Sequence, residues 1–302
     1  MMRKSTIIFA LLLLAAAGLL LHYGNYGLTL FVSIPILLGG VGAAIAQPKS
    51  AAGAAWAGVI ACLVACVGLL VFAAEGLGCI VMALPLLLPL GALGGVILYT
   101  LTHSKRSAVS LALLPIASFG IDATATPPTY EVTTSIEINA RPERVWQNVV
   151  AFPDLAAPSE WYFRAGLAYP TGTRIIGQGV GAKRFCDLST GSAVETMTRW
   201  ETARALEFDV TETPAPMEEL SPYGHIEAKH LHGYFVSKHG RFVLTPLAGG
   251  RTRVDGTSWY QHGLYPAPYW RLWTDATVHK IHERVFEHIK ALSENPSTRS
   301  PT

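Results

Sequence analysis

The feature that most constrains this chain is a set of four long apolar segments near its amino terminus. They cover residues 5–21, 28–46, 54–74 and 77–101. The hydrocarbon core of a bilayer needs about 20 apolar residues per helix. Inside that core every backbone polar group must be bonded within the protein, which favours helices. The pattern therefore predicts four transmembrane helices in an integral protein of a bacterial cytoplasmic (inner) membrane.

The first apolar segment is expected to be a retained helix and not a cleaved signal peptide. Arg3 and Lys4 precede it, as basic residues precede a secretory signal. However, no small-residue cleavage pattern leads from it into a polar mature sequence. The short stretch 22–26 leads into a second apolar run instead.

Charges on the short loops predict the orientation of these helices. The basic residues lie at positions 3–4, 49 and 105–106, whereas Glu75 lies in the intervening loop on the other side. Basic loops stay in the cytoplasm, so the amino terminus and the loops near Lys49 and Lys105 are expected there. Residues 107–121 are either a fifth span or a helix in the interface. We favour a fifth span, which makes the following domain extracytoplasmic, because residues 107–126 contain one charge, Asp122.

The remainder of the chain has the composition of a water-soluble domain. We expect a transmembrane region over residues 1–121, a polar linker over 122–129, a folded domain over 130–294 and a disordered tail over 295–302. Residues 131–302 contain 18 Lys and Arg against 19 Asp and Glu. A near-neutral balance without a basic stripe excludes the electrostatic footprint of a nucleic-acid-binding protein.

Residues 130–294 read as one strand, a short helix, many strands and a long closing helix. Val132, Thr134, Ile136 and Ile138 alternate with polar residues, and Pro142 then begins a short helix. Further strand-like runs are expected at residues 173–176, 182–188, 193–200, 205–211, 232–236, 241–246 and 251–260. The last two flank a turn at 247–250, which predicts a hairpin. Residues 269–292 show the spacing of an amphipathic helix.

Several stretches in this domain resemble the START/polyketide-cyclase superfamily (SRPBCC). They are INARPERVW at 138–146, GQGVGAKRF at 177–185, TRWE at 198–201, FVLTPLAGGRTRV at 242–254, and the long terminal helix. The resemblance implies a helix-grip fold, in which a curved antiparallel sheet wraps round the carboxy-terminal helix and leaves a cavity between them. The membrane region resembles no family.

The resemblance implies a membrane-anchored module that binds an apolar or amphipathic small molecule, such as a lipid or polyketide. The alternative is an enzyme of the cyclase/dehydratase type, with His230 or His232 as general acid or base in the cavity. The expected partners are that ligand and the membrane, with neither a cofactor nor nucleic acid; the sequence gives no protein partner.

Aromatic and polar residues supply the candidates for the cavity wall, because ligand pockets combine aromatic walls with a few polar groups. The candidates are Trp161, Arg164, His230, His232, Trp259, Tyr260, Trp270, Thr274 and Thr277. His230 and His232 are expected on one face of a strand. No third ligand stands at local spacing, and zinc sites need three or four, so no metal is expected.

Several other acidic, histidine and cysteine residues are interpreted as having no role in the site. Glu75 is expected to be a solvated loop carboxylate, and the H-x-x-H-E stretch at 279–283 a solvated helix face, since its histidines are not four residues apart. Cys62 and Cys66 are expected to be small packing residues. Cys186 is either a nucleophile or, as favoured, a buried apolar residue.

Overall fold

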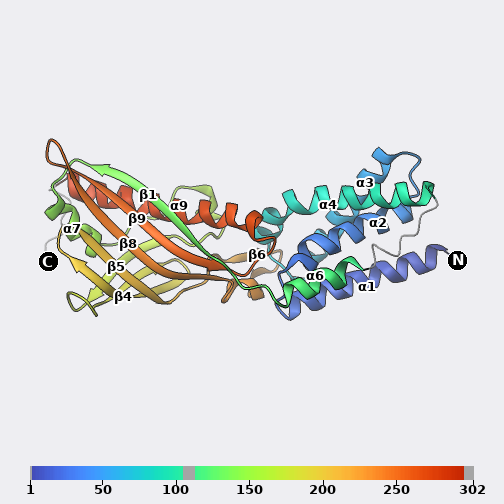
Figure 1. The fold of residues 1–302 in the computed structure, drawn as a ribbon, viewed down its shortest axis with the longest axis horizontal. Helices are drawn as coiled ribbons and strands as arrows, with labels where there is room; N and C mark the ends of the chain where they lie inside the picture. Colours follow the sequence, from blue (N-terminus) through green and yellow to red (C-terminus); the bar gives the residue numbers. More distant parts are fainter. Residues whose placement is uncertain (1, 105–112, 296–302) are drawn as a thin grey trace. The chain divides into compact units, whose positions relative to one another are not determined.

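The computed structural model describes residues 2–104 and 113–295, and it divides into two compact units (Figure 1). The first unit contains Met1–Pro127 together with two later segments, Glu219–His230 and Gly263–Trp270. The second contains Pro128–Glu218, Leu231–His262 and Arg271–Thr302. Two short segments from inside the predicted folded domain therefore belong to the unit that holds the apolar helices.

Four long apolar helices form most of the first unit. They are α1 (Met2–His22), α2 (Ile34–Ala46) with the π-helical turn η1 (Thr29–Ser33) before it, α3 (Ala51–Val71), and α4 (Leu77–His103). Each is long and apolar enough to cross a membrane, as the sequence predicts.

Glycines let the backbones of α2, α3 and α4 approach closely. A Cβ atom at Gly39 of α2 would lie 1.9 Å from the carbonyl oxygen of Gly91 in α4, and one at Gly58 of α3 would lie 2.1 Å from that same oxygen. Lipid provides no hydrophobic driving force between helices. Small residues at such crossings allow close van der Waals contact, which stabilises the packing instead.

The described part of the predicted fifth span is the nine-residue helix α6 (Leu114–Asp122); residues 107–112 lie outside the described residues. Asp122 is not part of a free linker. Its carboxylate accepts hydrogen bonds from the backbone N–H groups of Leu28 (2.7 Å) and Thr29 (2.9 Å), and from the Thr29 hydroxyl. These N–H groups begin a helix and have no partner within it, so the carboxylate stabilises the start of η1 and α2.

A seven-stranded antiparallel sheet and a long helix form the second unit, which confirms the predicted helix-grip fold (Figure 1). The strands are β1 (Thr129–Ile138), β2 (Pro170–Ile176), β3 (Lys183–Leu188), β4 (Gly191–Glu201), β5 (Ala205–Glu212), β8 (Phe235–Leu247) and β9 (Arg251–His262). Their order is β1-β9-β8-β5-β4-β3-β2. The helices are α7 (Pro142–Val150), the single turn α8 (Trp161–Arg164) and the closing helix α9 (Ala267–Glu294).

The core of the second unit lies between the sheet and the two longer helices. Buried residues of α9 (Val285, Phe286 and Ile289) and of α7 (Val145 and Val149) join those of the strands in one cluster. Fully burying a side chain of this size contributes about 1.5–3 kcal/mol. The short helix predicted to begin at Pro142 is thus confirmed, and it buries one face.

The strand expected at 232–236 is wrong in its first half. Lys229–Leu231 form a 3-10 turn, Gly233 has a φ of 76°, and β8 begins only at Phe235. From there β8 runs without interruption to Leu247, so it joins two strands that the sequence suggests are separate. The hairpin that follows is confirmed, and both Gly249 and Gly250 have positive φ in its turn.

The sequence does not suggest the small hairpin of β6 (Glu219–Ser221) and β7 (Gly224–Ile226), which belongs to the first unit. The Tyr223 hydroxyl in its turn donates to the carbonyl of Val71 at the end of α3 (2.8 Å). The Glu219 carboxylate accepts from the backbone N–H groups of Gly78 (3.0 Å) and Cys79 (2.7 Å) in the first turn of α4. Glu219 therefore acts as an N-terminal cap for a helix 140 residues away in sequence.

Candidate functional site

A cavity of about 140 Å³ lies in the second unit between the sheet and α9. Aromatic and aliphatic side chains form most of its wall, among them Phe208, Phe235, Phe242, Tyr260 and Val278. Polar side chains also reach it, namely Arg184, Glu195, Thr213, Ser237, Ser258 and His282. An apolar enclosure with a few placed polar groups is the usual form of a small-molecule site.

Arg184 and Glu195 form a buried ion pair in this wall. They lie opposite each other on β3 and β4, with 3.2 Å between Arg184 Nη1 and Glu195 Oε2. The guanidinium also stands 5.5 Å from the ring centre of Phe208 and 5.4 Å from that of Phe242. Burial raises the pKa of Glu195 to about 6, although Arg184 acts in the opposite direction. The cavity thus holds a carboxyl group that changes its charge just below neutral pH.

His282 is a neutral hydrogen-bonding group at the cavity. Its Nε2 lies 2.8 Å from Ser258 Oγ, and its Nδ1 lies 3.0 Å from Thr134 Oγ1. Burial, and then the proximity of His279, lower the pKa of His282 to about 4. One ring nitrogen therefore donates and the other accepts at neutral pH. The expectation of a solvated face at 279–283 is wrong for His282, because this part of α9 turns toward β1 and β9.

Tyr260 is the predicted site residue that lines the cavity. It lies on β9 and is fully buried. Its hydroxyl lies 2.9 Å from the Thr274 hydroxyl and donates to the Asp275 carboxylate, both on α9. Thr274, a second predicted site residue, therefore contacts the phenol that forms the wall and is not itself among the lining residues.

The structure places the other seven predicted residues away from this cavity. Trp161 and Arg164 are exposed on α8, His232 is exposed, Thr277 is half-buried on α9, and Trp259 points to the opposite face of β9 from Tyr260. His230 and Trp270 belong to the first unit, where Trp270 packs on Phe31 with 4.8 Å between ring centres.

Arg184, Glu195 and Ser258 are cavity residues that the sequence reasoning misses. A signal for the charged pair exists in the strand pattern. Arg184 alternates in step with Ala182, and Glu195 with Met197, so both charges share parity with buried apolar positions. Opposite charges on the buried faces of two consecutive strands indicate a cross-strand pair.

Cys186 also lines the cavity. Burial and the neighbouring Glu195 raise the pKa of its thiol to about 12, against a weaker opposing effect of Arg184. A thiol that stays protonated is a poor nucleophile. The geometry therefore favours the interpretation of Cys186 as a small, half-buried apolar residue of the cavity wall.

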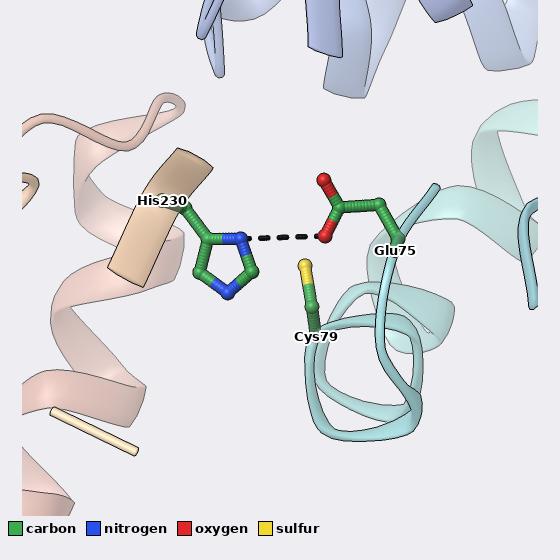
Figure 2. A group of neighbouring side chains, drawn as sticks. All are labelled: Glu75, Cys79 and His230. Carbon is green, nitrogen blue, oxygen red and sulfur yellow. Dashed lines mark ion pairs between the residues drawn. The ribbon is translucent and has the colours of Figure 1, made fainter. Parts of the chain in front are cut away.

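A second group of buried polar residues lies in the first unit, where the β6–β7 hairpin and η2 (Lys229–Leu231) meet the helix ends. Figure 2 shows three of its side chains, Glu75, Cys79 and His230, directed toward one another. His230 lies between two carboxylates, with 3.3 Å from Nδ1 to Glu75 Oε2 and 3.3 Å from Nε2 to Glu219 Oε1. The Tyr26 hydroxyl donates to the other oxygen of Glu75.

This group changes the interpretation of Glu75. The side chain is 2% exposed, so the expected solvated loop carboxylate is wrong. The loop before α4 is covered by Tyr26 and by residues that arrive from position 219 onward, which local sequence does not reveal. Burial alone would lower the pKa of His230, but the adjacent carboxylates of Glu219 and Glu75 outweigh it and raise the pKa to about 9.

A smaller pocket of about 90 Å³ adjoins this group within the first unit. Tyr26, Glu75 and Cys79 line one part of it, and apolar side chains of α1 to α4 line the rest. Cys62 and Cys66 are buried at its wall, which confirms their interpretation as packing residues. The buried polar residues Tyr26, Glu75 and Cys79 therefore border an otherwise apolar pocket.

The strand order and the closing helix define the second unit as a helix-grip domain. The solved structures that resemble the chain include three of known name. Norcoclaurine synthase from Thalictrum flavum is 11% identical, with a TM-score of 0.37, and covers 59% of this chain and 99% of its own. Zhui aromatase/cyclase from Streptomyces sp. R1128 is 14% identical, with a TM-score of 0.34, and covers 55% and 94%. The Aha1 dimer from Colwellia psychrerythraea is 13% identical, with a TM-score of 0.34, and covers 56% and 98%.

Likeness at this level concerns the fold and not the activity. No protein-family model matches the chain, and no curated protein matches it.

Proposed function

We propose that this protein is a membrane-anchored helix-grip module that binds a small apolar or amphipathic molecule between its sheet and α9. The observation that carries the proposal is the cavity of about 140 Å³ with its aromatic wall. An engineered protein cavity of about 150 Å³ binds benzene, whereas pockets for drug-sized ligands hold about 300–1,000 Å³. The cavity volume therefore favours a ligand, or the end of a ligand, with the size of one ring.

The polar groups in the wall favour a ring that carries a hydrogen-bonding substituent. Ser258 bonds to His282, whereas Arg184 and Glu195 meet as an ion pair in which Arg184 Nε, Arg184 Nη1 and Glu195 Oε2 are buried without a hydrogen bond from the described residues. A ligand hydroxyl or carbonyl would satisfy such atoms. A fully apolar ring would use only the aromatic wall. The ligand class that fits best is a phenol-like or similar amphipathic ring compound.

The proposal also includes the side of the membrane on which the helix-grip domain lies. Tyr223 and Glu219 bond to the ends of α3 and α4 next to Glu75, and Asp122 bonds to the start of η1. The opposite ends of these helices carry Lys49, which the positive-inside rule assigns to the cytoplasm. The segments that continue into the helix-grip domain thus leave the helices at the extracytoplasmic side. A ligand would reach this domain from the outer leaflet or the space beyond it.

A titration of the full-length protein in detergent micelles with phenol and with the two-ring 1-naphthol tests the proposed ligand size. Val278, which is buried at the cavity wall, is replaced by phenylalanine to fill the space. Ala276→Phe adds the same ring to an exposed position of α9 and is the matched control. We expect phenol to bind better than 1-naphthol, and Val278→Phe to weaken phenol binding at least about tenfold, a loss of about 1.4 kcal/mol.

Equal phenol binding by the wild type and Val278→Phe would contradict the assignment of the cavity as the site. Equal loss in Ala276→Phe would also contradict it, since that side chain does not enter the cavity.

One observation favours the second candidate, a cyclase- or dehydratase-type enzyme. Glu195 lies in the cavity with a pKa near 6, which suits a general acid or base at neutral pH. Neither His230 nor His232, the residues first considered for this role, lines the cavity. If a ligand recovered from the protein loses water during incubation and Glu195→Gln abolishes that loss, the protein is an enzyme; an unchanged ligand supports a binding module.

A further inference from the structure

We propose that Glu75, Cys79 and His230 in the first unit form a binding site for a zinc-type divalent metal ion. One ligand atom from each side chain lies within 4.8 Å of the others, and all three residues are buried. The site is distinct from the helix-grip cavity, and the binding of a small molecule there does not depend on it.

The distances suit a tetrahedral ion. Zinc bonds of about 2.3 Å to sulfur and about 2.0–2.2 Å to nitrogen and oxygen set ligand atoms roughly 3.3–3.8 Å apart. Glu75 Oε2 and His230 Nδ1 are already 3.3 Å apart. Figure 2 shows the Cys79 sulfur beside this pair, on the first turn of α4. Since the three ligand atoms lie within 4.8 Å of one another, side-chain movements of about an ångström would bring them to bonding distance of one ion.

The donor set selects the class of metal. A thiolate, an imidazole and a single carboxylate are typical ligands of zinc, whereas calcium and magnesium take six or more oxygen ligands.

The residues around the three ligands orient them as an outer shell does in metal sites. Glu219 Oε1 faces His230 Nε2 at 3.3 Å, which leaves Nδ1 for the ion. The Tyr26 hydroxyl donates to Glu75 Oε1, which leaves Oε2 for the ion. Such carboxylate–histidine pairs fix the ring and raise its basicity as a ligand.

A second observation points to a ligand at this position. Glu75 Oε2 is fully buried and meets His230 Nδ1 as an ion pair at 3.3 Å, but it accepts no hydrogen bond of normal geometry from the described residues. Both ring nitrogens of His230 share this property. Buried carboxylate and imidazole atoms are normally satisfied, because each unpaired one costs about 1–3 kcal/mol. An ion between them satisfies Oε2 and Nδ1 together.

Three protein ligands leave a fourth position of a tetrahedral ion open, the arrangement that zinc uses in catalytic sites. Glu75 and Cys79 also line the apolar pocket of about 90 Å³ among the helices. The fourth position would therefore be available to water or to a small ligand in that pocket.

Cobalt(II) titration of the full-length protein in detergent micelles, after treatment with a chelator, tests the site. Cobalt replaces zinc in tetrahedral sites, and a thiolate ligand gives a sulfur-to-cobalt charge-transfer absorption. We expect this absorption to saturate at one equivalent and to be displaced by zinc. Cys79→Ser should abolish it, and His230→Gln should weaken cobalt binding at least about tenfold.

Two controls separate the site from other thiols and from misfolding. Cys66→Ser removes a buried cysteine of α3 outside the group of three and should leave the absorption unchanged. The chain has four cysteines, so the triple variant Cys62→Ser/Cys66→Ser/Cys186→Ser retains Cys79 alone and should keep the full absorption. Absence of the absorption in the wild type, or its loss in the triple variant, would overturn the proposal. His230 would then serve only as a counter-charge to the two carboxylates.

Discussion

At the scale of single residues, burial in the helix-grip cavity favours the neutral form of both an acid and a base, so it shifts the pKa of Glu195 upward and that of His282 downward. His282 stays neutral because burial disfavours its charged form, and the proximity of His279 adds to this effect. Glu195 resists ionisation because it is buried, and its partner Arg184 only partly offsets that cost. Buried groups of this kind tie the stability of the domain to pH.

The lowered pKa of His282 predicts acid sensitivity. Between about pH 6.5 and pH 4 the unfolded chain binds a proton on this histidine that the folded chain does not, so stability falls as the pH falls. The shift corresponds to about 3 kcal/mol. We expect urea unfolding, followed by tryptophan fluorescence of the full-length protein in detergent, to show this loss relative to His282→Gln.

Glu195→Gln supplies a control of the opposite sign. The raised pKa of Glu195 means that stability falls as the pH rises from about 4.5 to 6, by about 2 kcal/mol. Glu195→Gln should remove that fall and leave the acid loss of His282 in place. A wild-type protein and a His282→Gln variant with parallel pH profiles would show that the imidazole is not buried in its neutral form.

At the scale of elements, the spacing of residues predicts most helices and strands, and long-range contacts account for the errors. The period-2 pattern at β1 and the helical spacing at α7 and α9 hold because each element buries one face. The stretch from Glu219 to His232 is misread because its partners are residues 71–79, far away in sequence. His230 therefore enters a 3-10 turn and a buried group of the first unit and does not line the cavity.

The candidate site is predicted less well than the fold for the same reason. Tyr260 was identifiable because an aromatic residue on a half-buried strand has a defined face. Arg184 and Glu195 were not singled out, because their importance depends on the register that places β3 opposite β4. Glu75, Cys79 and His230 come from positions that no local spacing rule connects.

The packing of α9 on the sheet can be tested at Gly256 of β9, where the two elements approach each other closely. A Cβ atom at Gly256 of β9 would lie 2.5 Å from Cζ of Phe286 on α9. Gly256→Ala should therefore destabilise the protein by about 1–3 kcal/mol through overpacking. Phe286→Leu removes the obstructing ring edge, so the double variant should be more stable than the sum of the two single effects by about 0.5–3 kcal/mol.

Phe208→Leu is the control for this cycle, because Phe208 belongs to the same core without lying against Gly256. Its effect should add to that of Gly256→Ala without coupling. Purely additive behaviour of Gly256→Ala and Phe286→Leu in thermal unfolding would mean that α9 does not contact β9 at this point.

At the scale of the whole molecule, four long apolar helices and a helix-grip domain are joined in one chain, and chain segments from positions 219–230 and 263–270 pack with the helices. Because these segments pack with the helices, several contacts, and not the linker alone, determine on which side of the membrane the helix-grip domain lies. Since Asp122, Glu219 and Tyr223 all bond near the ends of the helices opposite Lys49, we expect the helix-grip domain outside the cytoplasm.

A reporter fused after Thr302 measures this topology. We expect alkaline phosphatase activity and no fluorescence from a fused green fluorescent protein, because the former is active only outside the cytoplasm. A fusion after Lys49 is the control and should give the reverse pattern. Bright fluorescence from the carboxy-terminal fusion would mean that the helix-grip domain lies in the cytoplasm and that the chain does not cross the membrane a fifth time.

Native mass spectrometry of the full-length protein, extracted from its own membrane in mild detergent, tests the central claim most directly. We expect one molecule of ring-compound size bound per chain, retained in Ala276→Phe and lost in Val278→Phe, because only the second substitution fills the cavity of about 140 Å³. Retention of the same molecule in Val278→Phe, or co-purification of membrane phospholipid alone in equal amount with all three proteins, would contradict the account.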